Sequence, residues 1–213
     1  MNRSMPVWIG AGLAALLSAC GGGGTATPLV VAIGNSITIA PPTPSVQWAG
    51  NWGMAVSAPS LDYAHTVAAG LGANLIAANM VPLERDPTGR RDLIAGAAAN
   101  VTADALAIVE LGDNVPADQA ANFVPAYVAL LDAVAPARRL VCVATWWLEK
   151  PALDAQLRAA CLAHGGRWVE IHDLKTDPRN VAENGTYSNP AVDAHPHAWA
   201  MSQIAARIEA AAQ

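Results

Sequence analysis

The chain carries few charges and no run of basic residues. Only 14% of its 213 residues are charged, and 17 Asp and Glu residues outnumber 12 Lys and Arg residues. No stretch of the sequence gathers Lys or Arg into a cluster. Nucleic acids and anionic lipid surfaces are bound through such clusters, so we expect neither as a partner.

Cysteine and histidine are also scarce, with three and five residues respectively, and no Cys/His spacing is typical of a zinc site. The sequence therefore does not predict a zinc site. Cys142 falls in an apolar segment and Cys161 in a helical segment that follows it. The sequence leaves open whether these two form a disulfide or remain two buried free thiols.

Long apolar runs are lacking except near the amino terminus. There, Arg3 precedes an uncharged stretch, residues 6–17, that is too short to span a bilayer. The stretch ends in Leu17-Ser18-Ala19-Cys20, a small-residue ending that is typical of a secretory signal. This ending also resembles the bacterial lipobox, which implies cleavage before Cys20 and lipidation of its sulfur. A plain signal peptide is the alternative.

The expected organisation has three parts. Residues 1–19 are a lipoprotein signal peptide, residues 20–28 are the lipidated Cys20 with a glycine-rich tether, and residues 29–213 are one domain with a full hydrophobic core. We expect a protein anchored by lipid in a bacterial cell envelope, with the outer membrane as the favoured membrane. The anchored domain would face the periplasm or the cell surface.

Within the domain, short apolar runs alternate with amphipathic segments. The runs predict strands at 29–33, 74–78, 105–111, 140–145 and 168–171, and the amphipathic segments predict helices at 61–71, 91–99, 117–134, 151–164 and 197–211. Regular β-α alternation favours a parallel sheet that is covered by helices on both faces. The predicted fold class is therefore a three-layer α/β/α domain with a five-stranded parallel sheet.

Two stretches interrupt this alternation. Residues 40–60 form a long connection that is rich in Pro and Gly but also contains tryptophans, which argues against disorder. Because this loop leaves the first strand, we expect it to fold over the carboxyl edge of the sheet. Residues 173–190 are polar and turn-rich, and they lead into the last helix.

Polar residues follow three of the predicted strands. Ser36 follows the first strand, Gly112-Asp113-Asn114 follows the third, and Asp193 and His195 come after the fifth. The carboxyl ends of parallel strands lie at one edge of the sheet, where ligands bind. A serine needs an imidazole to accept its proton, and amide donors stabilise the oxyanion that forms when it attacks a carbonyl. These residue types in this order indicate acyl transfer.

Gly34-Asn35-Ser36-Ile37-Thr38 resembles the first block of the SGNH (GDSL-type) hydrolases, in which Asp is commonest at the position of Asn35. Gly112-Asp113-Asn114 resembles the third block of that family, and His195-Pro196 resembles the fifth. The resemblance spans nearly all of residues 29–213. It implies a flavodoxin-like sheet, Ser36 as nucleophile, His195 as base, and an oxyanion hole formed by the Ser36 N–H and the Asn114 side chain. It implies no metal and no organic cofactor.

The chain departs from this family pattern at two places. Val81 stands where the second block supplies a glycine N–H, and it could still serve as a third oxyanion donor. The usual fifth block is Asp-x-x-His, whereas here Asp193 lies two residues before His195 and Val192 lies three before it. We expect Asp193 to complete the triad. The alternative is a Ser-His dyad in which a main-chain carbonyl orients the ring.

Several aromatic residues follow strands of the same edge. We expect Asn35, Trp146 and Trp48 to contact substrate, although the tryptophans could equally pack the long loop onto the sheet. The expected function is hydrolysis of carboxylic esters with short acyl groups, such as O-acetyl groups on envelope glycans. The alternatives are a lipase, lysophospholipase or thioesterase, and a non-catalytic lipoprotein that binds glycan on a hydrolase scaffold. The oligomeric state is not predicted.

Overall fold

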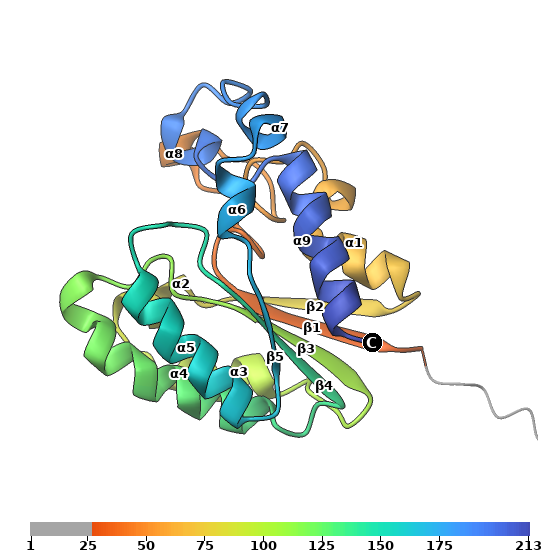
Figure 1. The fold of residues 1–213 in the computed structure, drawn as a ribbon, viewed down its shortest axis with the longest axis vertical. Coiled ribbons are helices and arrows are strands. Elements are labelled where there is room, and N and C mark those ends of the chain that lie inside the picture. The colour runs from red at the N-terminus through yellow and green to blue at the C-terminus, as the bar shows by residue number, and fades with distance from the viewer. Residues whose placement is uncertain (1–26) are drawn as a thin grey trace, which may run out of the picture.

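The computed structural model describes residues 27–213, which form a five-stranded parallel sheet between two layers of helices (Figure 1). The strand order is β2-β1-β3-β4-β5, which is the flavodoxin-like order. The predicted three-layer α/β/α fold class is therefore confirmed. The predicted signal peptide, Cys20 and most of the tether lie outside the described residues.

All five predicted strands are present, with small shifts at their ends. They are β1 (Leu29–Gly34), β2 (Asn74–Asn79), β3 (Ala105–Glu110), β4 (Arg139–Val143) and β5 (Arg167–Val169). Strand β1 lies in the centre and pairs Gly34 with Asn79 of β2 and with Glu110 of β3. The ends of these three strands therefore lie side by side at the carboxyl edge.

The five predicted helices are also present, and short helices are added between them. The longer ones are α1 (Tyr63–Gly70), α3 (Asp92–Ala98), α4 (Ala120–Val134), α5 (Pro151–Ala163) and α9 (Ala198–Ala211). The short ones are α2 (Val81–Arg85), α6 (His172–Lys175), α7 (Pro178–Val181) and α8 (Pro190–Asp193). Within residues 27–213, none of these helices has the length and apolar character that a membrane span requires.

Alternate residues of the central strands pack into two separate cores. Val30 and Ala32 of β1 belong to the core beneath α1 and α9, whereas Val31 and Ile33 belong to the core beneath α3, α4 and α5. Figure 1 shows these two groups of helices on opposite sides of the sheet. Burial on both faces explains why β1 is a continuous apolar run in the sequence.

The long loop 40–60 covers the carboxyl edge, as expected. The Trp48 indole N–H donates to the Ala40 carbonyl (2.9 Å), and the Asp62 carboxylate accepts the Gly53 N–H (3.0 Å). A third small core, which contains Trp48 and Val192, joins this loop to the segment before α9. Segments far apart in the sequence thus build one wall of the edge.

The segment 173–190 was predicted as a turn-rich stretch, but the structure folds much of it into short helices. Helices α7 and α8 begin with prolines and are capped by side chains: the Asp177 carboxylate accepts the Arg179 N–H, and Asn189 accepts the Ala191 N–H. Elements of four residues have no recognisable apolar period. The sequence pattern therefore does not distinguish them from turns.

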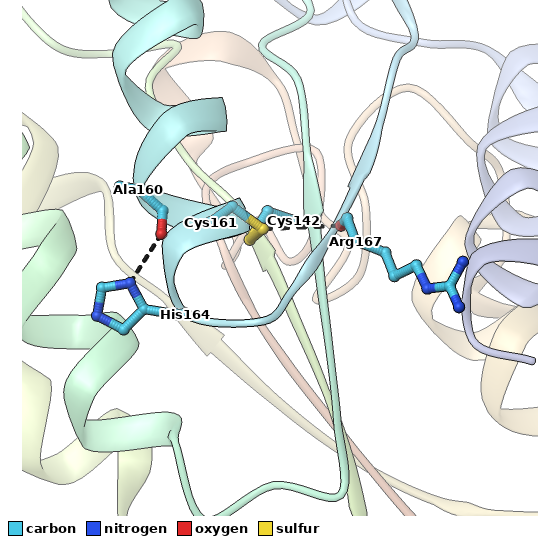
Figure 2. The surroundings of a disulfide bond; sticks show 5 residues. All are labelled: Cys142, Ala160, Cys161, His164 and Arg167. Atoms are coloured by element: carbon cyan, nitrogen blue, oxygen red, sulfur yellow. Dashed lines mark hydrogen bonds between the residues drawn. A yellow bond between two sulfur atoms is a disulfide. The ribbon is translucent and has the colours of Figure 1, made fainter.

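A disulfide joins Cys142 of β4 to Cys161 of α5, and Figure 2 shows the bond between the strand and the helix. Both residues are buried in the core beneath α3, α4 and α5. The structure thus resolves the alternative that the sequence left open, in favour of the pair.

We predict that replacing both cysteines, Cys142→Ala with Cys161→Ala, lowers the free energy of unfolding by about 2–4 kcal/mol. The bond closes a loop with a sequence separation of 19, and losing it frees the unfolded chain. Urea unfolding checks the value. Wild-type protein in reductant should lose a similar amount, and an unchanged midpoint in both samples would contradict the prediction.

Candidate active site

A tight turn at the end of β1 presents Ser36. The Asn35 carbonyl accepts the N–H groups of Thr38 (3.2 Å) and Ile39 (2.9 Å), and the Asn35 side chain accepts the Ile37 N–H (2.9 Å). A Cβ at Gly34 would collide with the Thr38 side chain and the Glu110 carbonyl, so this position requires glycine. The turn leaves Ser36 lining a cavity at the carboxyl edge.

His195 meets Ser36 across 159 residues of sequence. The Ser36 Oγ lies 2.8 Å from the His195 Nε2, which is hydrogen-bond distance. His195 follows α8 and is placed by the segment that packs on loop 40–60. The structure thus brings together the predicted nucleophile and the predicted base.

The other nitrogen of the His195 ring faces the main chain. Nδ1 lies 3.2 Å from the carbonyl oxygen of Val192, to which it can donate. Val192 is the residue that stands three before the histidine. The backbone carbonyl of Val192, and not a carboxylate, therefore orients the His195 ring.

The prediction that Asp193 completes a triad with His195 is wrong. The Asp193 carboxylate accepts the N–H groups of Gly185 (2.8 Å) and Tyr187 (3.0 Å), and it lies 3.7 Å from the Nε2 of His197. At two residues before His195, at the end of α8, its side chain points to this neighbouring loop instead. It stabilises the loop and does not orient the His195 ring.

His197 is buried, and its contacts are with the segment around it. Its Nε2 lies 2.9 Å from the Asp193 carbonyl, and its N–H donates to the Asn180 side chain. It therefore supports the segment that carries His195.

Burial lowers the pKa of His195 to about 4, and the carbonyls of Val192 and Ala191 offset this effect only in part. Lys175 adds a smaller lowering through its positive charge. An imidazole with this pKa is neutral at pH 7. It is therefore in the form that can accept a proton from the Ser36 hydroxyl.

Two hydrogen-bond donors border the space next to Ser36. Within residues 27–213, no protein acceptor takes the Ser36 N–H. The Asn114 side chain lines the same cavity, and its Nδ2 donates one hydrogen to Glu84 (2.8 Å), which leaves the second hydrogen for a ligand. Such donors suit an oxyanion.

Val81 was expected to supply a third donor, but its N–H donates to the Asn79 side chain (3.1 Å). Val81 begins α2, and Asn79 takes up the N–H that this helix start leaves without a helical partner. Val81 still lines the cavity, so it contributes shape.

Three carboxyl groups lie buried beneath this edge of the sheet, and we call Glu84, Glu110 and Asp113 the acid cluster. The Asn35 amide nitrogen lies among them, at 3.4 Å from Glu84, 3.1 Å from Glu110 and 3.2 Å from Asp113. Asn35 itself is fully buried. Asn35 lines the cavity, but its polar side-chain atoms serve the acid cluster and the turn, so its role here is to hold the turn that presents Ser36.

Burial is the main cause of raised pKa values throughout the acid cluster. It raises the pKa of Glu84 to about 7 and that of Glu110 well above its usual range, and the charge of Asp113 adds to both effects. The pKa of Asp113 is also raised by burial, while N–H groups of Trp146 and Trp147 partly counter this. An aspartate at position 35 would add a fourth carboxyl group here, whereas asparagine donates hydrogen bonds without adding charge.

Glu84 connects the acid cluster to the site, and no motif of the sequence points to this residue. Its carboxylate accepts the Gly112 N–H (2.6 Å) and the Asn114 amide (2.8 Å), so it fixes the loop that carries Asn114. Lys150 holds the same loop by donating to the carbonyls of Gly112, Asp113 and Val115 at 2.7–2.9 Å. Helix α2 has five residues, too few to show a period, which is why Glu84 was missed.

The cavity has a volume of about 460 Å³. Apart from Ser36, His195 and Asn114, its wall is mostly apolar, with contributions from loop 40–60, α2 and Trp147. Trp147 lies edge-on to the His195 ring, with 6.1 Å between ring centroids. Within residues 27–213, no group of three His, Cys, Asp or Glu side chains is arranged to hold a metal ion.

Trp146 and Trp48 do not line this cavity, so the expectation that they contact substrate is wrong. The Trp146 indole is buried and donates to the Ala194 carbonyl (2.9 Å), which holds the segment before His195. Trp48 packs edge-on against Trp52 within the loop core. Both tryptophans therefore have a packing role, which was the alternative to substrate contact.

Comparison with known proteins supports the fold. The structure is similar to that of the protein YxiM from Bacillus subtilis, with a TM-score of 0.56 and 11% sequence identity; the match covers 85% of this chain and 55% of YxiM. The chain thus spans little more than half the length of that protein. No protein-family model matches the chain, and no curated protein matches its sequence.

We predict that the protein loses stability as the pH rises from about 5 to about 8. The pKa of Glu84 rises on folding from its ordinary 4.5 to about 7, so the folded state holds the proton more tightly. The resulting stabilisation, about 3 kcal/mol, is complete below the unfolded pKa and is lost as the pH passes the folded pKa. Urea unfolding at several pH values measures it.

Glu84→Gln removes this titrating group, so its stability should fall less over the same pH range. The exposed carboxylate of Asp104 provides the control: Asp104→Asn should follow the wild-type curve. Parallel pH curves for wild type and Glu84→Gln would refute the assignment of the titration to Glu84.

Proposed function

We propose that the chain is a serine hydrolase of the SGNH type that cleaves carboxylic esters. The observation that carries this proposal is the 2.8 Å contact between the Ser36 Oγ and the His195 Nε2 inside a cavity that Asn114 also lines. The first-block, third-block and fifth-block motifs supply these three residues, and the fold agrees with such an enzyme.

In the acylation step, the Ser36 Oγ attacks the ester carbonyl carbon while its proton passes to the His195 Nε2. The carbonyl oxygen becomes an oxyanion, which accepts hydrogen bonds from the Ser36 N–H and the free hydrogen of the Asn114 amide. The tetrahedral intermediate then collapses: the bond to the alcohol oxygen breaks, and His195 returns its proton to that oxygen. The alcohol leaves and the acyl group stays on Ser36.

Deacylation repeats these steps with water. His195 takes a proton from the water molecule, the resulting hydroxide attacks the acyl carbon, and the same two donors hold the oxyanion. Collapse releases the carboxylic acid and returns the proton to the Ser36 Oγ.

The base works as part of a dyad. The Val192 carbonyl orients the His195 ring through Nδ1, but a neutral carbonyl stabilises the imidazolium less than a carboxylate does. Burial lowers the pKa of His195 by more than the Val192 and Ala191 carbonyls raise it. The His195 imidazole therefore remains unprotonated in mildly acidic conditions. Its affinity for the proton of Ser36 is correspondingly lower.

We propose that the acyl group is short, such as acetyl. The cavity of about 460 Å³ contains both the reactive groups and the apolar wall, which leaves room for a small acyl group and part of an alcohol. Envelope glycans that carry O-acetyl groups are the proposed natural substrates. Lipids are the rival class, and a preference for octanoyl over acetyl esters would favour them.

The proposed place of action is a bacterial cell envelope, with the chain anchored through Cys20. The disulfide between Cys142 and Cys161 supports an exported protein, because such bonds persist in oxidising compartments.

We predict that Ser36→Ala abolishes hydrolysis of p-nitrophenyl acetate and labelling by a fluorophosphonate, because both reactions need the hydroxyl. Asn114→Ala should retain labelling but lose about 10²–10³ in kcat, as expected when one oxyanion donor is removed. Exposed Ser202→Ala is the matched control. Equal background rates in wild type and Ser36→Ala would instead support the glycan-binding, non-catalytic alternative.

A further prediction separates a dyad from a triad. Asp193→Asn should lower kcat/KM by less than about tenfold, whereas losing a triad carboxylate costs about 10⁴-fold. The pH profile of the wild type should rise through about pH 4, where His195 loses its proton, and level off by pH 6. A midpoint near the ordinary imidazole value, together with a large loss in Asp193→Asn, would restore Asp193 as the orienting group.

A further inference from the structure

Helix α2 presents one of its faces to the cavity. Val81, Pro82 and Arg85 line the cavity wall. Arg85 lies three residues after Pro82 and four after Val81, which are the spacings that place side chains next to each other on a helix. Leu83 and Glu84 are fully buried behind them. The Arg85 side chain is therefore part of the same wall as the reactive groups, and nothing in the proposed chemistry uses it.

Arg85 is the charge that remains available in this cavity. Of the other titratable groups on the wall, His195 is neutral at pH 7 because burial lowers its pKa to about 4. The Asp113 carboxylate is engaged on both oxygens, by the N–H groups of Trp146 and Trp147 and by the Asn35 amide. Neither offers a free charge to a ligand.

The carboxylates next to Arg85 along the chain form other contacts. Glu84 points into the acid cluster, where it accepts the Gly112 N–H and the Asn114 amide. Asp86 accepts the Gly89 N–H (2.8 Å). In the part of the chain that the structure describes, no carboxylate forms an ion pair with the exposed Arg85 guanidinium.

We propose that the substrates are esters that carry an anionic group, which Arg85 binds. This inference rests on the proposed esterase function and narrows its substrate class. A guanidinium offers a planar pair of donors that matches the two oxygens of a carboxylate. The remainder of the wall is largely apolar, with Ile37, Val46 and Met54 among its residues, so it suits the uncharged part of the ester.

The test compares charged esters with neutral partners of similar size, and for the acetoxy compounds it follows release of acetate. 4-Acetoxybenzoate and its methyl ester place the charge in the alcohol part, whereas 4-nitrophenyl hydrogen succinate and 4-nitrophenyl butyrate place it in the acyl part. For each ester, the value of kcat/KM for the wild type is divided by the value for the variant. The intrinsic reactivity of the ester is the same in both values and therefore cancels. Arg85→Gln should lower kcat/KM for the charged member of at least one pair about tenfold more than for its neutral partner.

Two further variants sharpen the result. Arg85→Lys keeps the positive charge but lacks the planar guanidinium. It should therefore retain part of the preference for the charged ester over its neutral partner. Arg91→Gln removes an exposed guanidinium that lies outside the cavity, and it should leave the preference unchanged. Added NaCl should weaken the wild-type preference, because an exposed ion pair is screened.

The outcomes separate the two proposals. If the wild type hydrolyses the neutral esters through Ser36 but Arg85→Gln changes charged and neutral esters alike in both pairs, the assignment of Arg85 is overturned and the esterase function stands. If the wild type hydrolyses none of the four esters, the esterase function itself fails. Selective loss in one pair supports the assignment and shows which part of the substrate carries the charge.

Discussion

Burial of carboxyl groups beneath the carboxyl edge of the sheet is the constraint on which the candidate site depends. Glu84, Glu110 and Asp113 come from three different segments and meet around one asparagine amide. Charged carboxylates in such surroundings would be costly, so protons and N–H donors must be shared among them. That sharing ties the end of β1 to α2 and to the loop after β3, and it fixes Ser36 and Asn114 relative to each other.

The reactive pair illustrates a different solution to a common problem. An imidazole that acts as a base has to be held in one orientation, and here a carbonyl three residues earlier in the chain holds it. Asp193 lies two residues before His195, and its side chain bonds the N–H groups of Gly185 and Tyr187 in another loop. The backbone carbonyl of Val192 thus orients the His195 ring, while the side chain of Asp193 stabilises a loop.

Much of the fold could be predicted from the sequence because its signals are long or repeated. Five apolar runs in regular alternation with helices led to the parallel sheet, and Ser36, Asn114 and His195 were found from motifs at strand ends. The predictions that failed concern the direction in which a side chain points. The orientation of Asp193 and the packing of Trp48 and Trp146 are set by contacts between distant segments, and no local sequence pattern contains this information. Glu84 escaped notice because α2 is too short to show a period.

The direction of β1 has a consequence for where the enzyme would find its substrate. The strand begins at Leu29 and ends at Gly34, beside the reactive turn, so about 20 Å of extended backbone separates its start from the cavity. The described chain therefore enters the domain at the edge of the sheet opposite to the cavity. If the chain is anchored through Cys20, as we propose, the tether would join the domain away from the reactive groups and leave the carboxyl edge accessible to polymers.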